Sequence, residues 1–238
     1  IVKLPSDKYV GVPENEYSMM TLARMLGMNV PTVDLVDIDE IGGLPNDVSA
    51  LSGKAFVIER FDRLSDGSAV HMEDFAQIFG VYPRDKYKKA STANIAKVIA
   101  IESDQEDVRE FIRRLTFNTL VGNADMHLKN WSVYYPDRRI ARLAPAYDFL
   151  STIPYLPDNE AALKFSRTRR FDEFNEEELA HLAGRAGIPK ALALDAAKET
   201  VELFRQHWQV EKNHLPIYRE AVAEIDRHLA LLPIASLW

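Results

Sequence analysis

A cluster of polar side chains lies within nine residues of this chain, from Gly122 to Asn130, directly after an apolar helical run. Asp125 and Asn130 stand five positions apart in this cluster, and a second acid, Asp148, follows after two strand-like runs. A carboxylate can orient a hydroxyl group and accept its proton, while an amide and a second carboxylate can hold Mg²⁺ on nucleotide phosphates. These residue types, in this order, indicate phosphoryl transfer, with Asp125 as the catalytic residue and Asn130 and Asp148 as the metal ligands.

The spacing of Asp125 and Asn130 also has a purely local explanation, because Asp and Asn side chains often bond to the backbone in turns and helix caps. The same spacing occurs in the catalytic loop of protein kinases, and Asp148 comes where a kinase places the aspartate of its D-F-G sequence. In this chain the acid lies in Tyr147-Asp148-Phe149-Leu150, without the glycine. The ordered combination is less common than its parts and favours a phosphotransferase.

Two further chargeable residues, His127 and Lys129, lie inside the same loop. Either of them could contact phosphate oxygens, His127 as a hydrogen-bond donor and Lys129 as a cation. His127 could instead pack into the loop and bond to a backbone carbonyl, and Lys129 could be solvated. A zinc site at His127 lacks partner ligands at a usable spacing.

Lys3 is a single cation in the apolar run at the start of the chain. A strand end that faces a cleft would let Lys3 reach the phosphates of a nucleotide, as the strand lysine of protein kinases does. The alternative is an exposed lysine on an edge strand. Glu16, at the start of the following helical pattern, is the candidate partner of Lys3, although it could simply complement the positive helix N-terminus.

The polar run from Glu59 to Arg63 interrupts the apolar pattern and marks a hinge. The backbone at Glu59, Arg60 and Phe61 could bind the edge of an adenine, with Phe61 as an apolar surface; a salt-bridged turn is compatible with the same residues. The basic loop that follows, with Lys86, Lys88 and Lys89 between tyrosines, could contact an acidic partner or nucleic acid, or be a solvated loop face.

Composition describes an ordinary globular chain of 238 residues, with 47% hydrophobic and 27% charged residues. No apolar run approaches the roughly 18 residues that cross a bilayer, and we expect no membrane contact and a cytoplasmic location. Cys is absent, which excludes disulfides and thiolate metal sites, and the net charge of −7 argues against direct nucleic-acid binding across the chain. Because a strand-like run begins at Ile1, we expect that sequence upstream of it is missing.

The periodic patterns predict an α+β fold with a small lobe of sheet and helix at 1–63, truncated at its start, and a larger, mainly helical lobe at 64–238. We expect strands at 1–4, 31–38, 55–59, 131–135 and 140–143, a hairpin loop at 42–47, and helices at 13–26, 71–79, 92–101, 107–121, 176–186, 190–207 and 216–232. This arrangement would set the polar loop and the hinge on either side of one cleft.

Several segments together resemble the kinase core of HipA-type toxins, the serine/threonine kinases of bacterial type II toxin–antitoxin systems. They are, in order, Ile-Val-Lys-Leu-Pro (1–5), Asn-Glu-Tyr (15–17), Glu-Arg-Phe-Asp-Arg (59–63), Glu-Asp-Phe-Ala-Gln (73–77), Gly-Asn-Ala-Asp-Met-His-Leu-Lys-Asn (122–130) and Ala-Pro-Ala-Tyr-Asp (144–148). The resemblance covers residues 1 to about 170 and implies a two-lobed protein-kinase-like fold with ATP and Mg²⁺ as cofactors.

The resemblance also implies roles for single residues. Asp125 would be catalytic, and Asn130 and Asp148 would hold Mg²⁺. The ATP-binding set would be Lys3, Glu59, Arg60, Phe61, His127, Leu128, Lys129, Asn130, Tyr147 and Asp148. A glycine-containing phosphate loop with an autophosphorylated serine lies upstream of the lysine strand in this family, outside the present sequence.

Family members phosphorylate aminoacyl-tRNA synthetases, arrest translation and growth, and are neutralised by antitoxins that are often DNA-binding proteins. The resemblance therefore implies a protein substrate of that kind and an antitoxin partner, with nucleic-acid contact only inside an antitoxin complex. Two other functions stay open on the residues alone: a kinase of small molecules, and a non-catalytic pseudokinase that binds a partner. The acceptor, the oligomeric state and the antitoxin are not encoded in any pattern of the chain.

Overall fold

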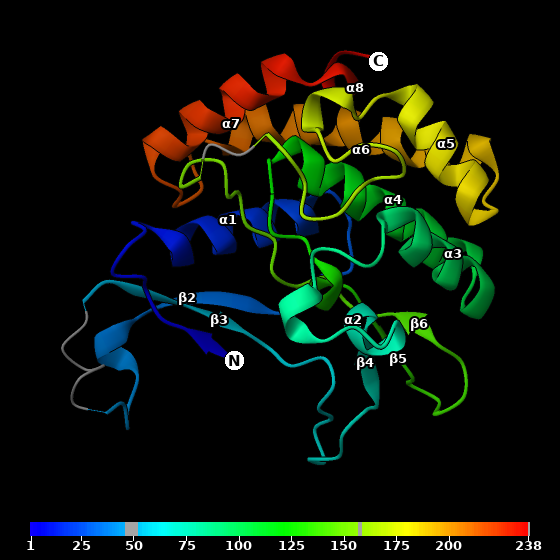
Figure 1. Ribbon diagram of the computed structural model, residues 1–238. Coiled ribbons are helices and arrows are strands. Elements are labelled where there is room, and N and C mark those ends of the chain that lie inside the picture. Colours follow the sequence, from blue (N-terminus) through cyan, green and yellow to red (C-terminus); the bar gives the residue numbers. More distant parts are fainter. Residues whose placement is uncertain (46–51, 157–158, 238) are drawn as a thin grey trace.

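The computed structural model describes residues 1–45, 52–156 and 159–237 and combines small sheets with a thick layer of helices (Figure 1). The strands are β1 (Val2–Lys3), β2 (Val33–Asp37), β3 (Lys54–Ile58), β4 (Met72–Asp74), β5 (Ser132–Tyr134) and β6 (Arg142–Leu143). The helices are α1 (Val12–Met25), α2 (Phe75–Ile78), α3 (Thr92–Glu102), α4 (Gln105–Leu120), α5 (Glu176–Ala186), α6 (Lys190–Glu211), α7 (Arg219–Leu231) and α8 (Pro233–Ser236).

The first sheet has the strand order β1-β3-β2, and all of its pairs are antiparallel. Lys3 of β1 lies opposite Phe56 of β3, and Val33 of β2 lies opposite Ile58. Helix α1 begins after Gly11, with Pro13 in its first turn, and packs against β2 and β3 on one side and α6 on the other. Figure 1 shows α1 between this sheet and the layer of α6 and α7.

The second sheet has the order β4-β5-β6 and carries the segment before Asp148. The predicted helix at 71–79 is wrong in its first half, because Met72–Asp74 pairs with β5 as a strand. Helix α2 begins only at Phe75, where Asp74 and Gln77 bond reciprocally to each other's backbone amide at 2.8 and 2.9 Å. Pairing with a distant strand thus overrides the local helical pattern.

The remaining predicted elements agree with the structure within a few residues at their ends. Helix α4 starts at Gln105, two residues earlier than predicted, because the Asp104 carboxylate accepts a hydrogen bond from the Asp107 amide at 3.0 Å. Within the predicted hairpin loop at 42–47, Asn46 and Asp47 lie outside the described residues.

A continuous apolar core joins the sheet to the helices, with Phe56, Phe111, Phe149 and Trp208 at most 2% exposed. Burying each side chain of this size stabilises the fold by about 1.5–3 kcal/mol. None of the helices in the described ranges combines the length and the apolar character needed to span a membrane.

Candidate functional site

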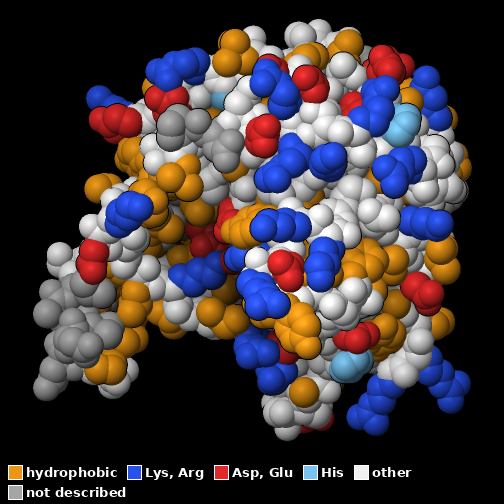
Figure 2. Space-filling view, viewed as in Figure 1, with side chains coloured by type: hydrophobic (Ala, Val, Ile, Leu, Met, Phe, Trp, Pro, Cys, Tyr) orange, Lys and Arg blue, Asp and Glu red, His pale blue; other side chains and the backbone are white. Residues whose placement is uncertain are grey.

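Two adjoining cavities lie between the β1–β3–β2 sheet and the helical part of the molecule. The first, of about 390 Å³, is lined by β1 and β3, the 59–62 segment and residues of the second sheet. The second, of about 470 Å³, contains Asp125 and Asn130 in its wall. Lys3, Lys129 and Asp148 line both cavities, so the two form one continuous site. Figure 2 shows the corresponding hollow, with acidic and basic side chains inside it.

Lys3 joins the sheet to the rest of this site. Its ammonium group lies 2.6 Å from the Glu16 carboxylate of α1 and also forms an ion pair with Asp148. Strand pairing fixes the position of Lys3, whereas the two acids come from elements 13 and 145 residues further along the chain. The ion pairs with Glu16 and Asp148 hold the Lys3 ammonium group where the two cavities meet.

Burial and charge act in opposite directions on this group of three side chains. Burial raises the pKa of Glu16 to about 7, although the Lys3 cation pulls it downward. Burial by itself would lower the pKa of Lys3, but attraction to Glu16 and Asp148 outweighs burial, and the pKa of Lys3 is raised. Lys3 therefore remains a cation throughout the physiological pH range and can attract phosphate oxygens.

The loop at 122–130 leaves α4 through Gly122, which has a φ of 65°. A Cβ at Gly122 would come within 2.6 Å of the Ile153 side chain, so both the conformation and the space favour glycine. The Thr152 hydroxyl donates to the Gly122 carbonyl at 3.1 Å and accepts from the Ala124 amide at 2.8 Å. These contacts attach the beginning of the loop to the segment after Asp148.

Asp125 is held mainly through its backbone. Its carbonyl accepts hydrogen bonds from the His127 amide at 2.7 Å and from the Asn130 side chain at 3.0 Å. Its carboxylate is about half exposed, at 54%, and accepts a hydrogen bond from the Tyr87 hydroxyl at 2.5 Å. An exposed carboxylate at the wall of a cavity is suited to accept a proton from a bound hydroxyl group.

Asp148 adopts a left-handed backbone conformation with a φ of 57°, which Asp tolerates better than most residues. The Asn123 side chain donates to the Asp148 carbonyl at 3.2 Å and to the Asn118 side chain at 2.8 Å. Asn123 therefore connects α4, the loop that contains Asp125 and the segment that contains Asp148.

His127 is only 5% exposed, and its ring lies edge-on to Tyr87 with a centroid distance of 5.2 Å. Burial lowers the pKa of His127, in spite of the nearby Asp125 carboxylate, so the imidazole is neutral at physiological pH. Its Nδ1 atom has no hydrogen-bond partner within the described part of the chain. His127 therefore packs into the loop without the expected bond from Nδ1 to a backbone carbonyl, and it also lines the second cavity.

The hinge segment combines an apolar surface with ion pairs. Phe61 stacks on Tyr147 with ring centroids 6.0 Å apart, and both line the first cavity. The Arg60 guanidinium bonds to the Asp62 carboxylate at 2.8 and 2.5 Å. The Glu59 amide already donates to the Thr32 carbonyl at 2.9 Å, so this N–H group is not free for an adenine ring. The aromatic surface and the salt-bridged turn occur together.

Other predicted site residues occupy different positions. Lys129 lies 3.6 Å from the Asp74 carboxylate, and the Tyr147 hydroxyl donates to the Lys129 carbonyl at 3.0 Å. Leu128 is fully buried, and its side chain belongs to the apolar core instead of either cavity wall. Leu128 is thus a core residue, and its amide donates to the Lys86 carbonyl at 3.4 Å.

Sequence reasoning assigned no site role to Asp74 and Asn123, which line the cavities, or to Tyr87, which contacts Asp125. Asp74 and Asn123 lie in segments already singled out by the family resemblance, and this was a usable signal. Tyr87 lies in the basic loop, where nothing in the local pattern points to Asp125.

The oxygen atoms near Asp148 fit a hard cation that arrives with a nucleotide. The Asn130 amide nitrogen is engaged by the Asp125 carbonyl at 3.0 Å, which leaves the Asn130 oxygen as its remaining polar atom. Mg²⁺ is commonly bound by one or two protein oxygens, with phosphates and water as the other ligands. In the described ranges no three His, Asp or Glu side chains gather as a metal cluster, and a nucleotide would have to supply the other ligands.

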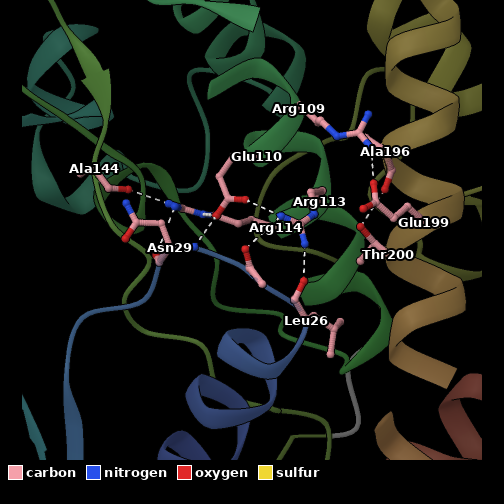
Figure 3. A network of polar contacts seen from close by, with 11 residues as sticks. Leu26, Asn29, Arg109, Glu110, Arg113, Arg114, Ala144, Ala196, Glu199 and Thr200 are labelled. Atoms are coloured by element: carbon pink, nitrogen blue, oxygen red, sulfur yellow. Dashed lines mark hydrogen bonds and ion pairs between the residues drawn. The ribbon is translucent and has the colours of Figure 1, made fainter. Parts of the chain in front are cut away.

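A network of arginines on α4 supports the segment that leads to Asp148 (Figure 3). Arg114 is 3% exposed and donates to Glu110 at 2.7 Å, to the Ala144 carbonyl at 2.6 Å and to the Asn29 carbonyl at 3.3 Å. Arg113 donates to the Leu26 carbonyl at the end of α1. The network thus joins α4, the end of α1 and the 144–146 segment.

Comparison with known proteins places these features in a family. The sequence model of the HipA-like C-terminal domain matches residues 1–208. The chain is 56% identical over 229 residues to "Putative kinase Y4dM" of Sinorhizobium fredii, which covers 96% of this chain and 56% of that protein. It is 27% identical over 218 residues to the serine/threonine-protein kinase toxin HipA of Shewanella oneidensis, which covers 79% and 45%. The chain spans about half the length of these curated relatives.

Solved structures give the same fold. HipA of Shewanella oneidensis, solved with HipB and operator DNA, matches with a TM-score of 0.76 at 23% identity, over 98% of this chain and 57% of that chain. The proinflammatory kinase CtkA of Helicobacter pylori matches with a TM-score of 0.64 at 14% identity, over 98% and 84%. The prediction of a two-lobed, kinase-like α+β fold is confirmed; the boundary predicted at residue 63 stays a prediction.

Proposed function

We propose, from the premise that this chain belongs to the family of HipA-like C-terminal domains, that it is the core of a protein kinase. It would transfer the γ-phosphoryl group of ATP to a serine or threonine hydroxyl. The observation that carries this proposal is the continuous pair of cavities that share Lys3, Lys129 and Asp148, with Asp125 in the wall of the second. The relatives named as kinases support the same activity.

The first cavity suits the nucleotide. Ile58, Phe61 and Met72 offer apolar surface to an adenine ring, and we expect the backbone of Arg60 or Phe61 to bond to its edge. Lys3 lies at the end of this cavity next to the second one, where its cation would bind phosphate oxygens. Binding there requires Lys3 to exchange part of its contact with Asp148 for the phosphates.

Asn130 and Asp148 would hold Mg²⁺, because both residues line the second cavity beside Lys3 and carry side-chain oxygen atoms. A bound Mg²⁺ neutralises the charge that develops on the phosphoryl oxygens. The Asp148 carboxylate could exchange Lys3 for the metal while the Asp148 backbone stays in place, since Asn123 bonds to its carbonyl.

Asp125 would orient the acceptor hydroxyl and accept its proton. The acceptor oxygen forms a bond to the γ-phosphorus, the bond from that phosphorus to the bridging oxygen breaks, and ADP leaves. Such a reaction needs positioning and charge neutralisation more than covalent help from the protein. The half-exposed carboxylate of Asp125 leaves room for an acceptor from solvent.

The biological setting follows the family resemblance. We propose an aminoacyl-tRNA synthetase as the protein substrate, arrest of translation and growth as the consequence, and a cytoplasmic location. An antitoxin would neutralise the kinase, because the fold matches a HipA solved with HipB and operator DNA. Contact with nucleic acid would then occur through the antitoxin.

Two other functions make different predictions. A small-molecule kinase would use the same Asp125 and Lys3 but would phosphorylate an antibiotic or a lipid instead of protein hydroxyls. A pseudokinase would bind a partner without Mg²⁺-dependent ATP binding. The apolar cavity and the cavity that contains Asp125 meet at Lys3. This arrangement favours a phosphotransferase over a pseudokinase.

The proposed kinase activity is tested by incubating the chain and a bacterial lysate with γ-labelled ATP and Mg²⁺ and identifying the labelled protein residues. Asp125→Asn should lower labelling by about 100-fold or more, because general-base catalysis is lost. Asp39→Asn, the same change at an exposed residue away from the cavities, is the matched control and should leave labelling unchanged. Equal labelling by the Asp125 variant and the wild-type chain would refute the assignment.

A further inference from the structure

Tyr87 makes a contact that the proposed roles do not explain. Its hydroxyl donates a hydrogen bond of 2.5 Å to Oδ1 of Asp125, across 38 positions of sequence. Tyr87 comes from the loop between α2 and α3, whereas Asp125 comes from the loop after α4. The two loops therefore meet at the carboxylate that would accept the proton.

Little else within the described ranges restrains the Asp125 carboxylate. Hydrogen bonds from His127 and Asn130 hold the Asp125 carbonyl, but they leave the side-chain torsions free. The His127 ring nitrogen Nε2 is 4.0 Å from Asp125 Oδ1, beyond hydrogen-bond distance. The hydrogen bond from Tyr87 therefore determines the orientation of the half-exposed Asp125 carboxylate.

Tyr87 is 37% exposed and contacts the 122–130 loop with its ring and its hydroxyl. Its ring lies edge-on to His127, at an interplanar angle of 78°. The Lys86 ammonium lies 4.9 Å from the centre of the Tyr87 ring, and the Lys86 carbonyl accepts a bond of 3.4 Å from the Leu128 amide. The Tyr87 ring thus rests on His127 of the 122–130 loop, and this contact sets the direction from which its hydroxyl reaches Asp125.

We propose that Tyr87 is a positioning residue, which aims the Asp125 carboxylate at the acceptor hydroxyl; this inference rests on the proposed phosphotransfer. A carboxylate offers about four lone-pair positions, and Tyr87 occupies one of them. Because the Asp125 side chain remains 54% exposed, its other oxygen stays open to an acceptor. This openness favours positioning over two rival roles of Tyr87, as a gate that blocks the acceptor or as an acceptor itself.

The first test measures ADP release with ATP and Mg²⁺, where water is the acceptor, for the wild-type chain, Tyr87→Phe and Tyr82→Phe. Removing the Tyr87 hydroxyl should lower kcat by about 10- to 100-fold, because misplaced catalytic groups lose this much, and should leave KM for ATP unchanged. Tyr82 lies in the same loop and is 71% exposed; its variant should match the wild-type chain.

Other outcomes of this measurement overturn the inference. Faster ADP release by Tyr87→Phe would show that the hydroxyl blocks the acceptor position. Phosphate found on Tyr87 of the wild-type chain by mass spectrometry would show that Tyr87 is an acceptor. An unchanged kcat in Tyr87→Phe would show that Asp125 needs no support from Tyr87. The proposed function would still stand in that case if ADP release depended on Asp125.

A second measurement examines the contact without relying on activity. Urea unfolding midpoints are compared for Tyr87→Phe, Asp125→Ala and the double variant. Coupled residues give non-additive shifts, so the double variant should lose less than the sum of the single variants. Additive shifts would remove the basis of the inference. Failure of the wild-type chain to turn over ATP in an Asp125-dependent way would instead refute the proposed function, and the catalytic role of Tyr87 with it.

Discussion

Single residues hold the segments of the candidate site together. Asn123 bonds to Asn118 on α4 and to the carbonyl of Asp148, so one amide side chain links the two acids of the proposed mechanism to a helix. Gly122, directly before it, allows the chain to turn out of α4 with a positive φ. The position of Asp125 therefore depends on a residue that has no side chain.

Gly122→Ala should destabilise the fold by about 1–3 kcal/mol, because an L-residue at positive φ is strained and its Cβ would also displace Ile153. The free energy of urea unfolding measures this loss. Gly80→Ala is the matched control, since Gly80 has a φ of 60° and an open space where a Cβ would be added. A loss at Gly122 no larger than that at Gly80 would show that the close approach of Ile153 has no effect.

The order of the motifs in the sequence predicted which residues would line the candidate site. Lys3, Asp125, Asn130 and Asp148 share one cavity wall, as the order of strand, loop and hairpin predicted. Tyr87 escaped prediction because its contact with Asp125 depends on how two irregular loops meet, which no periodic pattern encodes. Leu128 was assigned to the ATP site with its loop neighbours, but an apolar side chain in such a loop turns into the core.

At the scale of elements, α4 carries the loop of the candidate site, and α7 supports the end of α4. The His228 ring of α7 lies with Nε2 2.8 Å from the Thr119 carbonyl in the last turn of α4, edge-on to Phe171. Burial lowers the pKa of His228 below its usual value of 6.5. Burial thus favours the neutral imidazole, whose Nε2–H donates a hydrogen bond to the Thr119 carbonyl and joins the two helices.

The contribution of His228 to the stability of the protein should consequently fall as the pH drops below about 6.5, whereas Glu16, with its raised pKa, contributes in the opposite direction. In this range the unfolded chain binds a proton at His228 that the folded chain resists, so acid favours unfolding. His228→Gln keeps a donor but does not titrate, so lowering the pH from 7 to 5 should be less destabilising for this variant than for the wild-type chain. His127, whose pKa is also lowered, should account for part of the remaining slope. Thermal unfolding midpoints across this pH range measure the effect, and an identical slope in the variant would contradict it.

Most elements could be predicted from apolar periodicity, because helices such as α5 and α6 bury one continuous stripe. The exception at 71–79 has a physical cause. Met72–Asp74 is too short to show an alternating pattern, and only its pairing with β5 makes it a strand. The reciprocal contact of Asp74 and Gln77 is a capping signal that could have placed the helix start at Phe75.

At the scale of the whole molecule, the candidate site lies where the first sheet meets the helical part. Lys3 of the sheet and Asp148 of the helical part form an ion pair across 145 positions of sequence. This ion pair lies where the two cavities meet. The same fold occurs in HipA and CtkA. The nucleotide would therefore bind between two structural units and contact both.

We expect the phosphates of ATP to bind together with Mg²⁺ at this boundary between the cavities. Calorimetric titration with ATP, with and without Mg²⁺, tests it in the wild-type chain, in Lys3→Met and in Lys54→Met, whose lysine forms an exposed ion pair on the same sheet. We predict Mg²⁺-dependent binding that weakens by about tenfold or more in Lys3→Met, as for lost charge-assisted bonds, and is unchanged in Lys54→Met. Equal binding by all three chains, or no effect of Mg²⁺, would contradict the claim.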